Sequence, residues 1–233
     1  MSVREEGARL VDLSHRLTSG GTVFPGDPQI RLAPAARIDA DGFAVTSVTM
    51  GSHSGTHVDA PSHTVAGGRT MDDVDVARLI GRAHLLRVPG LAPRKRIGLA
   101  RLEGQLAALP DDARIVLLVT GWDRFWGDAA YLDHPFLDGL VGEHLRDRGV
   151  DVLGVDTLNP DETAPEGSAP LPVHEALLGA DRLIIENLRG LADLPASVTS
   201  LELTALPLPL GGADGAPVRA IARIPAEAWA GCP

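Results

Sequence analysis

The side chains best suited to chemistry lie in one short segment, which reads His53-Ser-Gly-Thr-His-Val-Asp-Ala-Pro-Ser-His63. Three of the eight histidines of the chain lie here, together with an aspartate. Imidazole nitrogens and carboxylate oxygens are common ligands of zinc and of other divalent transition metals. A single histidine is usually an ordinary core or surface residue, but this grouping favours a metal site.

The spacing of these residues argues against a helix. Asp59 follows His53 by six residues, which is about 240° around an α-helix, so the two side chains would point apart. Pro61 also biases the residue before it away from the helical conformation. In an extended segment, His57 and Asp59 lie on the same side, and a bend at Gly55 can bring His53 to join them. We predict a loop or irregular strand end that binds metal.

The composition is that of a soluble globular protein without a nucleic-acid partner. The 233 residues are 44% apolar and 22% charged, and the net charge is −10. A nucleic-acid-binding surface needs clustered Lys and Arg, so this charge argues against DNA or RNA. Aromatic residues make up only 3% of the chain, so Leu, Val, Ile and Ala must fill the core. The aromatic candidates for a pocket wall are Phe24, Trp122, Phe125 and Trp126.

The chain has one cysteine, Cys232. One cysteine supports neither a disulfide framework nor a thiolate metal site, so nitrogen and oxygen must hold any metal. The first residues contain no apolar signal-peptide core, and no apolar run approaches the roughly 18 residues of a membrane span. We therefore expect a cytoplasmic protein without a membrane partner.

The apolar pattern predicts a single mixed α/β domain over residues 1–233. Alternation of strand and helix, which is typical of parallel sheets, is clear only in the middle of the chain. Strands are predicted over residues 8–15, 43–50, 83–88, 115–119, 152–155, 183–185, 198–206 and 218–224. Helices are predicted over residues 71–80, 98–109, 137–148 and 174–178, and a long loop over residues 159–172.

Two residues outside the histidine-rich segment are further candidates. Glu186 ends an apolar strand, where burial of an unpaired carboxylate is costly, so a cation or a metal is its expected partner. His174 lies twelve residues earlier, at the start of the preceding helix. Both also fit ordinary roles, as a surface glutamate and a solvated histidine at a helix start.

The segment from His53 to His63 resembles the HxGTHxDxPxH signature of the cyclase family of metal-dependent hydrolases. That family includes bacterial kynurenine formamidase (arylformamidase) and isatin hydrolase. The eleven-residue signature is highly specific, whereas the other shared motifs are individually weak but occur in the order of the family. They are Asp12-Leu-Ser-His15, Phe24-Pro-Gly-Asp27, Thr120-Gly-Trp122, Gly154-Val-Asp156-Thr157, Ile185-Glu-Asn-Leu188, Ala205-Leu-Pro-Leu208 and Asp214-Gly-Ala-Pro-Val-Arg219.

The resemblance implies a fold, an assembly and a set of roles. The implied fold is the swivelling β/β/α domain of the family, in a homodimer or homotetramer. One or two divalent metals per subunit, zinc or manganese, are implied. The residues that match the ligands of the first metal are His53, His57 and Asp59, and those that match the second are Asp59, His174 and Glu186. The catalytic acid/base of the family falls on His63.

The resemblance also implies a reaction. The leading expectation is hydrolysis of N-formylkynurenine to kynurenine and formate, a step of tryptophan catabolism, with Phe24 and Trp122 against the substrate ring. Bacterial kynurenine formamidases typically carry Trp where this chain has Phe24, which stacks but has no N–H donor. One alternative is hydrolysis of a cyclic amide or lactone, as in isatin hydrolase. Another is a non-catalytic metal-binding protein, against which His63 counts because a structural site needs no further imidazole.

Overall fold

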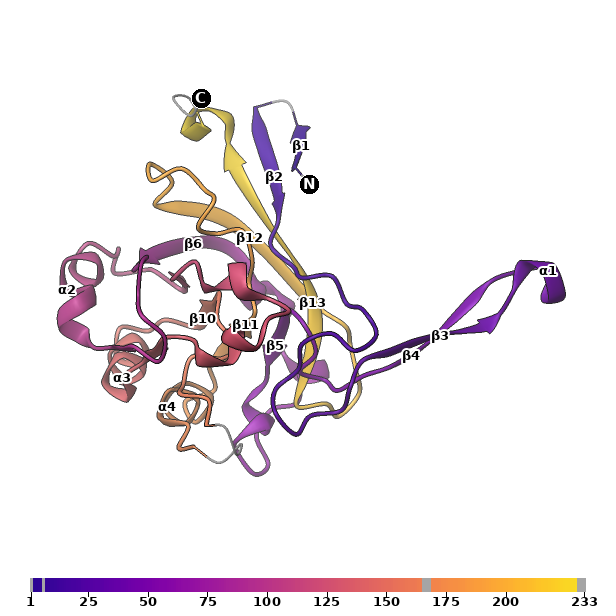
Figure 1. Cartoon of the computed structure of the whole chain (residues 1–233). Helices are drawn as coiled ribbons and strands as arrows, with labels where there is room; N and C mark the ends of the chain where they lie inside the picture. The colour runs from indigo at the N-terminus through magenta and orange to yellow at the C-terminus, as the bar shows by residue number, and fades with distance from the viewer. Residues whose placement is uncertain (1, 6, 165–168, 230–233) are drawn as a thin grey trace.

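One mixed sheet organises the molecule (Figure 1). The computed structural model describes residues 2–5, 7–164 and 169–229, so Cys232 and part of the predicted loop lie outside it. Nine strands form this sheet in the order β1-β2-β13-β12-β6-β8-β10-β11-β5, and β5 pairs with β13 as well. The strands from β13 to β5 therefore close into a ring, and β1 and β2 extend it from β13.

The elements that the structure describes agree closely with the sequence pattern. The strands of the main sheet are β1 (Ser2–Glu5), β2 (Ala8–Asp12), β5 (His57–Asp59), β6 (Ile80–Arg87), β8 (Ile115–Val119), β10 (Val152–Val155), β11 (Leu183–Glu186), β12 (Ser200–Pro207) and β13 (Gly215–Pro225). Two small sheets pair β3 (Arg31–Ala36) with β4 (Val45–Thr49) and β7 (Arg96–Ile97) with β9 (Phe136–Leu137). The α-helices are α1 (Ile38–Asp41), α2 (Leu99–Ala107), α3 (Gly139–Asp147) and α4 (Pro172–Leu178).

The middle of the chain folds as strand–helix–strand because its strands are apolar on both faces. β6, β8, β10 and β11 are parallel neighbours, and α2, α3 and α4 follow the first three of them in turn. Val116 and Leu118 of β8 pack in the layer beneath these helices. Leu117 and Val119, which point to the opposite face, pack in the interior of the ring. The prediction of a mixed α/β fold with a mixed sheet is confirmed.

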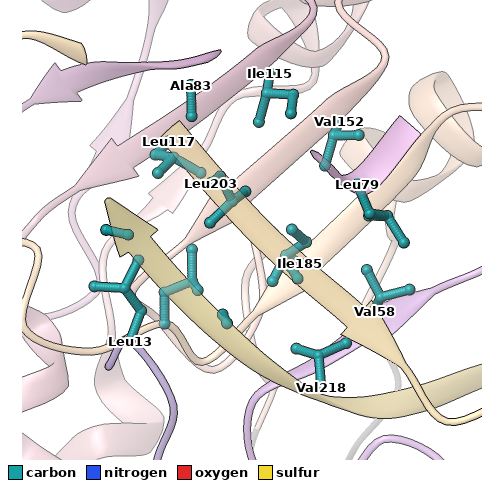
Figure 2. Packing of buried hydrophobic residues seen from close by; sticks show 14 of the residues in the cluster. Leu13, Val58, Leu79, Ala83, Ile115, Leu117, Val152, Ile185, Leu203 and Val218 are labelled. Atoms are coloured by element: carbon teal, nitrogen blue, oxygen red, sulfur yellow. The ribbon is translucent and has the colours of Figure 1, made fainter. Parts of the chain in front are cut away.

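The interior of the ring is the larger of two main apolar cores. Leu117, Ile185 and Leu203 project into it from three different strands (Figure 2). Leu13 and Leu79 reach the same core from segments outside the ring strands, and both are fully buried. This core fixes the positions of the strands that carry the polar residues described below.

The helix predicted over residues 71–80 is wrong. The segment forms two separate 3₁₀ turns, Met71–Asp73 and Val76–Leu79, with Val74 extended between them. Met71, Val74 and Leu79 are all buried in the main core, and the broken conformation turns all three inward. Asp75 accepts a hydrogen bond from the backbone of Ala77 and so begins the second turn. Tertiary burial thus overrides a helical pattern.

The antiparallel hairpin of β3 and β4 projects away from the body of the molecule (Figure 1). We call residues 31–49 the arm. α1 is a single turn at its tip, and every residue of β4 is exposed. The arm exposes several large apolar side chains, namely Leu32, Ile38, Phe43, Val45 and Val48. Among the described residues, no helix is long and apolar enough to cross a membrane.

Candidate metal centre

The five predicted metal ligands meet around β5, although they come from distant parts of the sequence. β5 carries His57 and Asp59, and β11, which pairs with it, ends in Glu186 opposite His57. α4 carries His174, and the segment before β5 carries His53. Nitrogen and oxygen atoms of His53, His57 and Asp59 lie within 4.8 Å of one another, as do those of Asp59, His174 and Glu186. Both ligand sets predicted from the sequence are therefore brought together.

The hydrogen bonds of His57 fix which nitrogen faces the other ligands. Its Nδ1 lies 2.8 Å from the carbonyl oxygen of Gly55 and donates a proton to it. Nε2 then faces two carboxylates, at 3.2 Å from Asp59 Oδ1 and 3.3 Å from Glu186 Oε2. Burial lowers the pKa of His57, but Asp59 and Glu186 raise it overall to about 10. A metal ion among these groups would replace the proton on Nε2.

His174 is oriented in the same way by Asp161. The Nδ1 of His174 donates to Asp161 Oδ2 at 2.7 Å, so Nε2 faces Glu186 Oε1 at 3.2 Å and Asp59 Oδ2 at 3.6 Å. The Asp161 carboxylate also accepts the backbone N–H groups of Val173 and His174, at 2.9 and 3.1 Å. It therefore caps α4 and fixes the imidazole ring with the same side chain. A carboxylate behind a ligating histidine is the usual arrangement in metal sites.

His53 reaches the cluster through a bend and a close contact. Gly55 has φ +66°, in the left-handed region that favours glycine, and provides the predicted bend. The Nδ1 of His53 lies 2.7 Å from Asp59 Oδ1, and Nε2 lies 3.0 Å from Asp214 Oδ2. A Cβ on Gly215 would lie 2.6 Å from the His53 ring, so only glycine leaves room for it there.

His63 lies beside the two ligand sets. It ends the 3₁₀ turn Pro61–His63, and its ring centroid is 4.0 Å from that of His53. Its Nδ1 lies 3.2 Å from Asp214 Oδ2. The side chain is 29% exposed, whereas those of His57 and His174 are almost fully buried. His53, His63 and Asp214 also form a third group whose ligand atoms lie within 4.8 Å of one another.

The cluster has the donors and the unpaired atoms that a divalent metal requires. Three buried atoms have no hydrogen-bond partner among the described residues, namely His57 Nε2, Asp59 Oδ2 and Glu186 Oε1. A buried polar atom without a hydrogen bond is costly unless a cation binds it. The set contains nitrogen and oxygen but no sulfur, which fits zinc and manganese. The residues present therefore fit a metal.

A cavity of about 390 Å³ opens onto the cluster. Its polar floor includes His53, His57, His63 and Glu186, and a largely apolar wall rises beside them. That wall is contributed chiefly by two segments, Thr22–Pro28 and the loop that follows β10, with Val23, Phe24, Leu158, Ala164, Ala169 and Leu171. The predicted wall residue Phe24 therefore lines the cavity beside the candidate ligands.

Trp122 does not line the cavity. It is 3% exposed and packs with Tyr131 and Leu158 in a small aromatic core. Its indole N–H donates to the carbonyl of Tyr131 at 3.2 Å. The hydroxyl of Tyr131 donates to Asn187 Oδ1, and Asn187 Nδ2 donates to the carbonyl of Gly55. The scarcity of aromatic residues predicts a wall residue, but in the structure Trp122 packs behind the site and is linked through Tyr131 and Asn187 to Gly55, whose carbonyl orients His57.

Three further aspartates around the site were not singled out from the sequence. Asp214 contacts His53 and His63, Asp161 contacts His174, and Asp27 lines the cavity. Burial is the first cause that raises the pKa of Asp27 above its ordinary value. Asp27 and Asp214 lie within motifs noted above, but an aspartate in a turn or loop is too common to indicate a role. Their partners lie up to 161 residues away, so only the fold brings them together.

Comparison with known proteins finds relatives over nearly the whole chain. The family model described as a putative cyclase matches residues 11–162. The kynurenine formamidase of Salinibacter ruber is 34% identical over 218 residues, which cover 92% of this chain and 97% of that protein. The kynurenine formamidase of Geobacillus thermodenitrificans is 34% identical over 214 residues, with 91% and 96% covered.

The chain is also similar to solved structures of isatin hydrolases. An isatin hydrolase bound to the product analogue thioisatinate superimposes with a TM-score of 0.82 at 25% identity, covering 94% of each chain. Isatin hydrolase A from Labrenzia aggregata, bound to benzyl benzoate, also gives a TM-score of 0.82, at 26% identity over 94% of this chain and 95% of that chain.

Proposed function

Because the chain belongs to the cyclase family, in which it is a metal-dependent amide hydrolase, we propose that its substrate is an aryl formamide. N-formylkynurenine is the leading candidate, which would place the reaction in tryptophan catabolism. The observation that carries this proposal is the cavity itself. It presents an apolar wall with Phe24 to an aromatic ring and the histidine–carboxylate cluster to the amide.

We propose one or two divalent metals, zinc or manganese, in the cluster. His53, His57 and Asp59 would hold the first, and Asp59, His174 and Glu186 the second, with Asp59 shared. A metal bound there would polarise the amide carbonyl and increase the acidity of a water molecule. The orphaned buried atoms and the absence of sulfur support this assignment.

His63 would move the proton in this reaction. Its Nδ1 faces Asp214 Oδ2, so an Nδ1–H donated to that carboxylate leaves Nε2 free to accept a proton from the attacking water. The water oxygen bonds to the formyl carbon and the C–N bond breaks. His63 then returns the proton to the departing aryl nitrogen, so formate and an arylamine leave. Phe24 would hold the aromatic ring by stacking.

A cyclic amide or lactone is the second candidate substrate. The likeness to isatin hydrolase structures over nearly the whole chain favours it. A protein that binds metal without catalysis is the third interpretation. The imidazole of His63, which lines the cavity beside two full ligand sets, counts against it.

We further propose a single domain over residues 1–233 that assembles as a homodimer or homotetramer. The ligands come from β5 and β11 of one ring, from the segment before β5 and from α4, which supports one domain. The arm supports assembly, since an isolated two-stranded hairpin is marginally stable in water and this one exposes apolar side chains.

The activity is tested with purified protein, stripped of metal and then reconstituted with zinc or manganese. Hydrolysis is measured on N-formylkynurenine, formanilide, isatin and a lactone. We expect metal-dependent turnover of the two formamides, with formate released in equal amount to the arylamine. Preference for isatin would select the second candidate, and bound metal without turnover of any compound would contradict an amide hydrolase.

A further inference from the structure

Among the described residues, the cavity beside the cluster is lined by no basic side chain other than histidine. None of the described residues that line it is Lys or Arg. Residues 165–168, which the structure does not describe, are Pro-Glu-Gly-Ser and include no Lys or Arg. The acidic residues that line the cavity are Asp27, Glu162, Glu186 and Asp214.

Three of these four carboxylates already have partners. Asp214 contacts His53, His63 and Ser52, and Glu186 faces the ligand histidines. Glu162 lies 3.2 Å from the guanidinium of Arg94. Arg94 also donates to Asp133 and to the carbonyl of Thr163, and these contacts hold it outside the cavity lining.

Asp27 is the exception. Its side chain makes no hydrogen bond or ion pair with the residues that the structure describes, although it is only partly exposed. Its backbone N–H donates to the carbonyl of Phe24 at 3.0 Å, in the turn that presents both residues to the cavity. The turn that places Phe24 in the cavity lining therefore also places a carboxylate there.

We propose that Asp27 sets the charge preference of the enzyme. It selects amides that carry an ammonium group over amides that carry a carboxylate. This inference rests on the proposed function and concerns the same cavity. An anionic group that enters this part of the cavity loses water and meets no Lys or Arg. A cationic group gains a charge-assisted hydrogen bond to Asp27. A zwitterionic substrate would direct its ammonium group to Asp27 and its carboxylate to solvent.

The test compares three formanilides that differ in one ring substituent, namely aminomethyl, methyl and carboxylate. The metal-loaded protein should show the highest kcat/KM on the cationic compound and the lowest on the anionic one. In Asp27→Asn, the ratio of kcat/KM for the cationic to the neutral compound should fall about tenfold, the scale of a hydrogen bond to a charged group. Asp193→Asn, an exposed carboxylate that does not line the cavity, should keep the wild-type ratio.

Two results would overturn the inference, namely an unchanged ratio in Asp27→Asn or a wild-type preference for the anionic compound. Metal content is measured in both variants, so a change in ratio is not mistaken for loss of metal. If no formanilide is hydrolysed, the proposed function fails. Calorimetric binding of the same compounds to the metal-loaded protein then still tests the charge preference, because an equal affinity for all three rejects it.

Discussion

Each buried histidine of the cluster is oriented from behind by a hydrogen bond through Nδ1. The carbonyl of Gly55 holds His57, and the carboxylate of Asp161 holds His174. In both residues Nε2 is therefore directed at the carboxylates of the cluster. Three of the candidate ligands, His53, His57 and Asp59, lie close together in the sequence, whereas His174 and Glu186 lie far from them.

The spacing of residues in the sequence predicts some members of the site but not the residues that orient them. His53, His57 and Asp59 are six residues apart at most, so their types and spacing alone favoured a shared site. Asp161 and Asp214 act on histidines that are 13 and 161 residues away. No periodicity marks an aspartate in a loop as the partner of so distant a ring, and only the tertiary structure identifies it.

Asp161→Asn should weaken the second metal site. The amide keeps one oxygen acceptor but loses the charge that holds the His174 ring and part of the cap of α4. We expect metal affinity at this site to fall about 10- to 100-fold, the usual effect of such supporting residues, as measured by competition with a chromophoric chelator. Asp138→Asn is the matched control, because Asp138 caps α3 with a bond to Leu140 N and contacts no candidate ligand. Equal affinity in the two variants would contradict the orienting role.

His63→Ala should separate catalysis from metal binding. We expect the variant to keep its metal, because the two predicted ligand sets are complete without His63, and to lose turnover by about 100-fold or more. Elemental analysis and kcat on formanilide measure the two effects. If the variant instead lost metal, His63 would belong to the third group of ligand atoms, with His53 and Asp214.

The strands of the sheet were easier to predict from the sequence than the segments that connect them. Every predicted strand is present, and most of them are buried apolar runs, whereas β4 in the predicted segment 43–50 is exposed. β5 was foreseen only as an irregular strand end, and β3 was not foreseen, because its residues are exposed and carry no periodicity. The helix at 71–80 failed because its apolar residues are needed in the ring core. Trp122 was expected in the cavity but supports the neighbouring loop through Tyr131 and Asn187.

Asp151, directly before β10, joins this strand to the segments that precede β6 and β11. It pairs with Arg78 at 2.7 Å, in the turn before β6, and with Arg182 at 3.2 Å, in the turn before β11. Burial raises the pKa of Asp151, but the hydrogen bonds and charges of the two arginines lower it overall. A carboxyl group with a lowered folded pKa stabilises the fold above its ordinary pKa, and this stabilisation disappears as the pH falls through the folded value.

Asp151→Asn should therefore destabilise the protein in a manner that depends on pH. At neutral pH we expect a loss of about 1–2 kcal/mol in the free energy of unfolding, the scale of hydrogen bonds to a charged partner. The difference from wild type should shrink as the pH falls below the ordinary pKa of aspartate. Urea unfolding across this range measures it, with the exposed pair of Asp147 and Arg146 as control, where Asp147→Asn should change little. A difference that does not vary with pH would contradict the argument.

At the scale of the whole molecule, the arm is the feature that the rest of the fold does not explain. It carries five of the large exposed apolar side chains, and Leu32 at its base exchanges hydrogen bonds with Ser19. The double variant Ile38→Asp/Phe43→Asp should reduce the assembled species, as measured by light scattering after size exclusion. Leu140→Asp, at an exposed leucine of the body, should leave the assembly intact. A wild-type protein that is monomeric at micromolar concentration would contradict the assembly role.

The closure of the ring through β5 also limits when the backbone amides of this strand become accessible to solvent. Most strands at the end of a sheet can fray, but β5 is paired with β11 on one side and with β13 on the other. The N–H of Ala60, directly after it, donates to the carbonyl of Asp214 at 2.9 Å. Amide hydrogens here can exchange with solvent only when the ring opens, which approaches global unfolding. We therefore expect slow deuterium uptake by residues 57–60, both with and without metal.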